Sequence, residues 1–202
     1  MIRTIACDTE TGGIYGDYSL LTAYFEVLDE QFNVLDSLDL AIKPQDDMYH
    51  VTAEALAVNK INLIEHDKTA VPKSLAGQQL RNFLIKNSEM GKIKLVPLGH
   101  NVSYDLQTIY RELLNKREAE RYLSYGSEDT GVLGRTLKRL GLIPEQLSTS
   151  LSSYAKFYGI EVTAAHTASG DTKTTVAVFK AMLQQIKNLN PMAAHAHQIQ
   201  EY

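Results

Sequence analysis

The chain has 202 residues, of which 44% are hydrophobic and 22% charged, and its formal net charge is −4. These values are typical of one globular domain and exclude a disordered or collagen-like chain. No apolar run approaches the roughly 18 residues of a membrane span, and an acid stands already at Asp8, so we expect no signal peptide and a cytoplasmic protein. The single cysteine, Cys7, lies in an apolar run and is expected in the core.

The first part of the chain predicts an antiparallel meander, because three runs of branched and aromatic residues are separated by short turns. Strands are expected over residues 2–7, 18–28 and 33–42, and a fourth over 93–98. Apolar residues at helical spacing predict helices over 52–56, 72–85, 102–114, 129–140, 150–158 and 169–186, with a loop or short helix over 116–128. This order indicates an α/β domain over residues 1–188, followed by a C-terminal tail over 189–202.

Asp8 and Glu10 stand two positions apart at the end of the first expected strand. Side chains at i and i+2 of a strand point to the same face, and two carboxylates placed in this way repel unless a cation lies between them. Hard oxygen ligands of this kind favour Mg²⁺ or Mn²⁺. Solvated acids at a strand end are the alternative that the pair alone leaves open.

Two later segments place acids near the starts of helices. Asn101 follows a strand that stops at Gly99 and is expected to cap the next helix, with Asp105 about one turn further on. His166 precedes the last helix and Asp171 lies at its start. Helix capping and the helix dipole explain each of these segments on its own. Only the occurrence of all the segments in one chain points to a function.

Together these segments resemble the DnaQ-like 3′–5′ exonuclease superfamily in its DEDDh branch, which includes polymerase proofreading ε-type subunits and ribonuclease T-like enzymes. That branch carries Asp-x-Glu, Asn-x-x-x-Asp and His-x-x-x-x-Asp, which read here Asp8/Glu10, Asn101/Asp105 and His166/Asp171. Tyr104, residues 50–56 and Asp129-Thr130 are softer matches, whereas Thr172 stands where the family usually has Ala. The resemblance covers about residues 2–183 and implies a ribonuclease H-like fold, a mixed five-stranded sheet flanked by helices.

The resemblance also implies a metal-dependent 3′–5′ exonuclease that shortens single-stranded nucleic acid, with DNA slightly favoured over RNA. Two divalent cations, Mg²⁺ or Mn²⁺, would be held by four acids: Asp8, Glu10, Asp105 and Asp171. His166 would act as the general base, because a ring that titrates near neutrality suits that task. These five residues are the expected catalytic set.

The segment after the first motif is expected to contact the terminal nucleotide. Thr11 and Gly12 would bring backbone amides close to it, because glycine leaves space. Ile14 or Tyr15 would press against the last base, although packing within the loop explains both equally well. Asn101 is the fourth expected substrate contact, beside Thr11, Gly12 and Ile14.

Charge is unevenly distributed along the chain. Residues 1–70 hold 4 basic and 13 acidic side chains, and residues 71–202 hold 16 basic and 11 acidic ones. An acidic metal pocket beside a surface that attracts phosphates is one interpretation, and ordinary solvated faces are the other. Candidate phosphate contacts are Arg111, Lys116, Arg117, Arg121, Arg135, Lys138 and Arg139, most of them better explained as solvated side chains.

The expected partner is a single-stranded 3′ end, and no membrane is expected. A DNA polymerase or a second copy of the chain is left open as a further partner. Two alternatives to the main interpretation remain: an exoribonuclease acting on short RNA or another small phosphodiester, and a non-cleaving module that binds 3′ ends or a polymerase.

Overall fold

The computed structural model describes residues 2–14 and 17–189. Its strands are β1 (Arg3–Thr11), β2 (Leu20–Leu28), β3 (Val34–Lys43), β4 (Val71–Pro72), β5 (Leu95–Gly99) and β6 (Glu128–Asp129). Its helices are α1 (Ala53–Asn59), α2 (Leu63–Thr69), α3 (Lys73–Asn87), α4 (Val102–Glu112), α5 (Lys116–Ala119), α6 (Thr130–Arg139), α7 (Leu151–Phe157) and α8 (Ala168–Leu189). The tail expected over 189–202 lies, from residue 190 on, outside the described residues.

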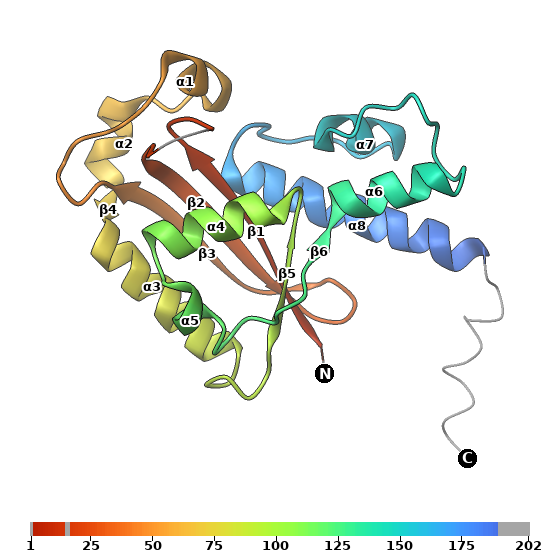
Figure 1. The fold of residues 1–202 in the computed structure, drawn as a ribbon, viewed down its shortest axis with the longest axis horizontal. Coiled ribbons are helices and arrows are strands. Elements are labelled where there is room, and N and C mark those ends of the chain that lie inside the picture. The colour runs from red at the N-terminus through yellow and green to blue at the C-terminus, as the bar shows by residue number, and fades with distance from the viewer. Residues whose placement is uncertain (1, 15–16, 190–202) are drawn as a thin grey trace.

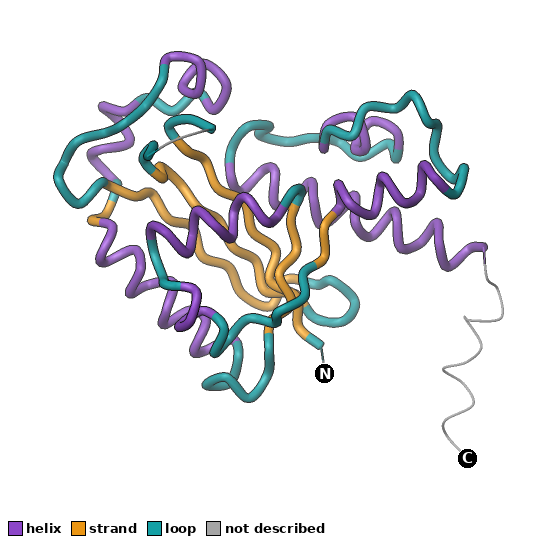
Figure 2. Tube along the Cα trace, in the orientation of Figure 1, coloured by secondary structure: helices purple, strands orange, loops and turns teal. Residues whose placement is uncertain are grey.

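The strands form one mixed sheet in the order β4-β3-β2-β1-β5-β6. The expected meander is confirmed, since β1 pairs antiparallel with β2 and β2 with β3, while β5 runs parallel to β1. The sheet has six strands rather than the expected five, because two-residue strands β4 and β6 pair in parallel at its edges. Strands this short leave no alternation to detect in the sequence. Figure 2 shows the strands as one layer with helices on both sides.

Helices cover both faces of the sheet (Figure 1), and the alternation of β1 divides its side chains between them. Ile5 and Cys7 belong to the core that the sheet forms with α3 and α4. Ala6, between them, packs in a separate cluster with Val176 and Phe179 of α8. The side chain of each even-numbered residue of β1 therefore points toward α8, and that of each odd-numbered residue toward α4.

A further core joins α6 and α7 to α8, away from the sheet. Leu137, Tyr154, Val178 and Met182 are fully buried there. Tyr154 lies so close to α6 that a Cβ at Gly134 would overlap its phenol group. Among the described residues, no helix is long and apolar enough to cross a membrane.

The close approach of α6 and α7 gives a test of packing. We expect Gly134→Ala to lower the free energy of unfolding by about 1–3 kcal/mol, because the added methyl group displaces a buried ring. Tyr154→Phe is the matched control: its hydroxyl has no hydrogen-bond partner in the described structure, so stability should be unchanged or slightly higher. Denaturant unfolding of both variants measures this, and a neutral Gly134→Ala would contradict the packing.

Candidate active site

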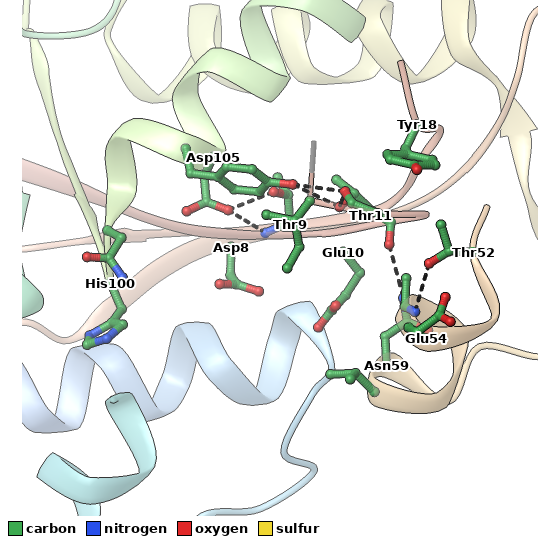
Figure 3. Close-up of a pocket in the computed structure, with 16 residues that line it drawn as sticks. Asp8, Thr9, Glu10, Thr11, Tyr18, Thr52, Glu54, Asn59, His100 and Asp105 are labelled. Atoms are coloured by element: carbon green, nitrogen blue, oxygen red, sulfur yellow. Dashed lines mark hydrogen bonds between the residues drawn. The ribbon is translucent and has the colours of Figure 1, made fainter. Parts of the chain in front are cut away.

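Three carboxylates from two elements meet at the end of β1. Asp8 and Glu10 point to the α8 side of the sheet, as Figure 3 shows, and Asp171 lies in the first turn of α8. One oxygen of each carboxylate can be chosen so that all three lie within 4.8 Å of one another. Thr167 holds the start of α8, since its carbonyl accepts the Asp171 amide at 2.9 Å and its hydroxyl accepts the Gly170 amide at 3.1 Å.

The fourth acid, Asp105, reaches β1 from the opposite face. The pairing of β1 with β5 ends at Ala6↔Leu98, so β1 continues with an open edge. At that edge Thr9 donates its amide to Asp105 Oδ1 at 2.9 Å and its hydroxyl to the same oxygen at 2.6 Å. Asp105 is 4% exposed. The Asp105 carboxylate thus accepts the hydrogen bond of the Thr9 amide, which β5 does not reach. Asp105 lies outside the cluster of Asp8, Glu10 and Asp171.

Burial and mutual repulsion make these acids hard to ionise. Burial raises the pKa of Glu10 to about 7, helped by the charges of Asp171 and Asp105. Burial also raises the pKa of Asp105 to about 7, against the bonds from Thr9 that lower it. The pKa of Asp8 lies well above its ordinary range, first through burial and then through its acidic neighbours.

Asp171 follows the same pattern with one opposing contact. Burial raises the pKa of Asp171, while a hydrogen bond from the His166 backbone amide lowers it. A divalent cation fits this donor set, because hard carboxylate oxygens converge within reach of one ion and its charge would remove the repulsion. Asp8, Glu10 and Asp171 are the residues that could hold it.

A cavity of about 730 Å³ opens beside the acids. Its lining combines acids with apolar and aromatic side chains: Asp8, Thr9, Glu10, Thr11, Gly13, Ile14, Tyr18, Thr52, Glu54, Ala55, Val58, Asn59, His100, Asn101, Tyr104 and Asp105. Tyr104 closes one side, since its hydroxyl lies 3.0 Å from Thr11 Oγ1 and donates to the Gly13 carbonyl at 3.2 Å. The volume suits one nucleotide, and the mixed lining suits a base next to a charged group.

The expected substrate residues Thr11, Ile14 and Asn101 line this cavity, whereas Gly12 does not. The Gly12 amide donates to Ser19 at 2.8 Å, and its carbonyl accepts the Thr52 amide at 2.7 Å. A Cβ at Gly12 would overlap the His50 carbonyl. Gly12 therefore lets two loops pack together, and its amide is not directed at a ligand. Tyr15, the other expected base contact, lies outside the described residues.

Asn101 stands at the N-cap position of α4, but its side chain makes no cap hydrogen bond. Its φ of 61° is left-handed, a conformation that Asn tolerates better than most residues. The expectation that its side chain caps the helix is therefore wrong. Asn101 instead lines the cavity, and its Oδ1 lies at the start of α6, 2.9 Å from the position of a Cβ on Gly131.

His166 lies on the exposed loop before α8, with a left-handed φ of 61°. Its backbone amide donates to Asp171, which fixes the loop beside the acidic cluster. His166 is absent from the walls of the cavity, while another histidine, His100, lines it. His100 Nδ1 lies 2.8 Å from Thr130 Oγ1, and burial lowers the pKa of the His100 ring.

Several lining residues gave no clear signal in the sequence. Tyr18, Val58 and Asn59 line the cavity from the β1–β2 loop and α1. Asn59 is buried and donates to the Thr11 carbonyl at 3.3 Å. Only the resemblance of residues 50–56 to the family pointed to this wall, and it named no contact.

Most of the expected phosphate contacts are not placed at the cavity. Arg111 pairs with Glu112 at 2.7 Å. Lys138 of α6 donates to the carbonyls of Glu145 and Leu147, so its charge is held against the loop that follows its helix. Arg135 differs, because its Nη1 lies 3.5 Å from the position of a Cβ on Gly131, and Asn101 Oδ1 lies 2.9 Å from the same point. Arg135 thus lies close to the cavity residue Asn101, and its charge also acts on the cavity residue His100.

The fold matches solved exonuclease I structures. E. coli exonuclease I in complex with a dT13 oligonucleotide shares 20% identity with a TM-score of 0.71, over 96% of this chain and 44% of that one. A second exonuclease I structure shares 19% identity with a TM-score of 0.75, over 96% of this chain and 44% of that one. Exonuclease I from Methylocaldum szegediense shares 19% identity with a TM-score of 0.67, over 96% of this chain and 42% of that one.

These matches confirm the fold expected from the resemblance to the DnaQ-like superfamily, a mixed sheet flanked by helices. The chain spans less than half the length of the exonuclease I chains that it matches. No protein-family model matches the sequence, and no curated protein does.

The raised pKa values predict how pH and metal act on stability. The pKa values of Glu10 and Asp105 in the folded chain, about 7, exceed their ordinary values of 4.5 and 3.8. Stability from the protonated forms is therefore complete below the ordinary values and is lost as pH rises toward 7. In chelator, Asp8→Asn should melt above the wild type at pH 8, by about 2–4 °C per kcal/mol of repulsion removed.

Adding Mn²⁺ should reverse the order of the two melting temperatures, because only the wild type keeps all three ligating carboxylates. Glu65→Gln is the matched control, since it removes an exposed acid that pairs with Lys68 on α2. Differential scanning calorimetry at pH 5 and pH 8 measures these shifts. Equal melting temperatures for Asp8→Asn and the wild type under every condition would contradict the repulsion.

Proposed function

We propose that the chain is a metal-dependent exonuclease that removes nucleotides from the 3′ end of single-stranded DNA. The observation that carries the proposal is the three-acid cluster of Asp8, Glu10 and Asp171 beside a nucleotide-sized cavity. The fold supports it, since the E. coli neighbour was solved with a dT13 oligonucleotide. The 3′ polarity comes from the resemblance of the three motifs to the DEDDh branch.

The three-acid cluster requires a bound cation for this function. A phosphodiester is anionic, so carboxylates in their charged form repel it. When bound, divalent cations stabilise charge on the phosphate and lower the pKa of water. Asp8, Glu10 and Asp171 would hold a divalent cation, and with Asp105 they would complete the set for the two ions, Mg²⁺ or Mn²⁺, that the resemblance implies.

The remaining walls position the terminal nucleotide. Ile14, Tyr18 and Val58 offer apolar and aromatic surface to the base. Asn101 offers an amide near the acids from its left-handed turn. Orientation of this kind lowers the barrier, because the scissile bond is held beside the acids before reaction.

His166 is the proposed general base. It takes a proton from the attacking water at an imidazole nitrogen, and its loop is already tied to Asp171 through the backbone. The charge of the His166 side chain already acts on the cluster, since it lowers the pKa of Asp171. Contacts of general bases are often loose before substrate is bound.

The first test is cleavage by the purified chain in Mg²⁺ or Mn²⁺. Single-stranded DNA and RNA, each labelled at the 5′ or the 3′ end, are the four substrates. A 5′-labelled DNA ladder should shorten stepwise, while the 3′ label is released in the first step. We expect Asp8→Asn to abolish this, and His166→Ala to slow it about 10²–10⁴-fold without unfolding the chain.

Each other outcome names an alternative. Faster shortening of RNA would identify an exoribonuclease. Binding of 3′ ends without cleavage, in a folded and metal-loaded chain, would identify a binding module. Cleavage by Asp8→Asn at the wild-type rate would overturn the site. Size-exclusion chromatography, alone and with a polymerase, tests whether a second copy or a polymerase is a partner.

Arg135 and Lys138 separate a phosphate contact from a structural charge. Arg135→Glu should reduce the slope of log binding constant against log salt by about 1, because one phosphate contact is lost. Lys138→Glu should leave that slope unchanged and lower the melting temperature, since Lys138 holds two loop carbonyls. Fluorescence anisotropy with labelled single strands, in Ca²⁺ to suppress cleavage, measures both slopes. An unchanged slope in Arg135→Glu would exclude this contact.

A further inference from the structure

Asp129 binds the starts of two helices at once. As the N-cap of α6, its Oδ1 accepts the amides of Gly131 at 2.8 Å and Val132 at 3.0 Å. The same carboxylate reaches α4, where Oδ1 accepts the Asn101 amide at 3.2 Å and Oδ2 accepts the Val102 amide at 2.9 Å. One side chain thus satisfies four backbone donors on two elements.

Helix α4 depends on this contact because it has no side-chain cap of its own. Asn101 makes no cap hydrogen bond, so Asp129 takes the place of a local cap. The two helix starts also touch directly, since Asn101 Oδ1 lies where a Cβ on Gly131 would crowd it. Figure 1 shows α4 and α6 starting side by side above β5 and β6.

The contact continues to the active site through one helical turn. Val102 is the first residue of α4, and Asp105 follows in the same turn. A single turn is short and rigid, so a shift of Val102 moves Asp105 with it. Asp105 in turn accepts both donors of Thr9 between Asp8 and Glu10.

We propose that Asp129 is a positioning residue, which fixes Asp105 against β1 by holding the start of α4 to that of α6. The inference rests on the proposed function for its effect on rate, but not for its effect on structure. Thr130 adds to the link, since its hydroxyl donates to the Gly99 carbonyl at 3.2 Å, at the end of β5. Asp129 acts only through Asp105 and contacts no substrate.

Asp129→Asn removes the bond to Val102, the first residue of α4, and keeps the bonds to the other oxygen. The amide oxygen still accepts the N–H groups of Gly131, Val132 and Asn101, whereas the amide nitrogen now faces the Val102 N–H, donor against donor. We expect the Thr9 amide to exchange with deuterium at least about tenfold faster, because its acceptor is displaced. We expect kcat for 3′ cleavage to fall about tenfold or more, with KM nearly unchanged.

The control is Asn62→Ala, which removes the cap of α2, where Asn62 accepts the amides of Ile64 and Glu65. It should lower the melting temperature without changing Thr9 exchange or kcat. Amide exchange followed by NMR does not depend on activity. Faster Thr9 exchange in a chain with no nuclease activity would support the positioning role and contradict the proposed function. Unchanged Thr9 exchange and kcat in Asp129→Asn would overturn the positioning role.

Discussion

Strand β1 continues to Thr11, whereas its pairing with β5 ends at Ala6. The open edge that results has backbone groups that need partners, because unpaired buried amides are costly. Asp105 supplies the acceptor for Thr9, and it does so from α4, the helix that follows β5. Alternation along the same stretch directs Asp8 and Glu10 to the other face, toward α8. A difference in strand length therefore determines where acids from three elements meet.

That meeting is unfavourable without a cation. The pKa values of Glu10 and Asp105, each raised to about 7, show that the fold holds acids where their charged forms are disfavoured. The rest of the chain must offset this cost, and its tightly packed cores do so. Local conflict at a site together with consistent packing elsewhere is typical of functional proteins.

The sequence alone predicted the meander and the long helices, because both depend on local periodicity. The convergence of Asp8, Glu10 and Asp171 was implied only by the resemblance of their motifs to the DEDDh branch. It did not predict α2, nor the two-residue strands β4 and β6, which are too short to show a period. The N-cap position of α4 was predicted correctly, but the side chain that accepts the Val102 amide was not. Asn101 has the right residue type and position, but Asp129 occupies that role across 27 residues of sequence from Val102.

Long-range contacts of that kind explain the other differences as well. Gly12 was expected at the substrate because of its position in the chain, and Lys138 was a candidate phosphate contact because of its charge. In the structure the Gly12 amide and carbonyl are bound by Ser19 and Thr52, and the Lys138 ammonium by the Glu145 and Leu147 carbonyls. Local sequence tells which groups a residue offers, and only the packed chain decides whether another part of the protein has already taken them.

Helix N-termini at the site offset part of the cost of ionising its carboxylates. Asp105 and Asp171 lie in the first turns of α4 and α8, and Asp129 caps α6. A helix N-terminus favours a negative charge, so each placement stabilises a carboxylate. The pKa values of Asp105 and Asp171 are nevertheless raised, which means that burial outweighs what the helix ends and the backbone donors provide. Positive charge from outside the chain would therefore favour full ionisation of the cluster near neutral pH. Under the proposed function a bound cation would supply that charge and would also attract the anionic phosphate.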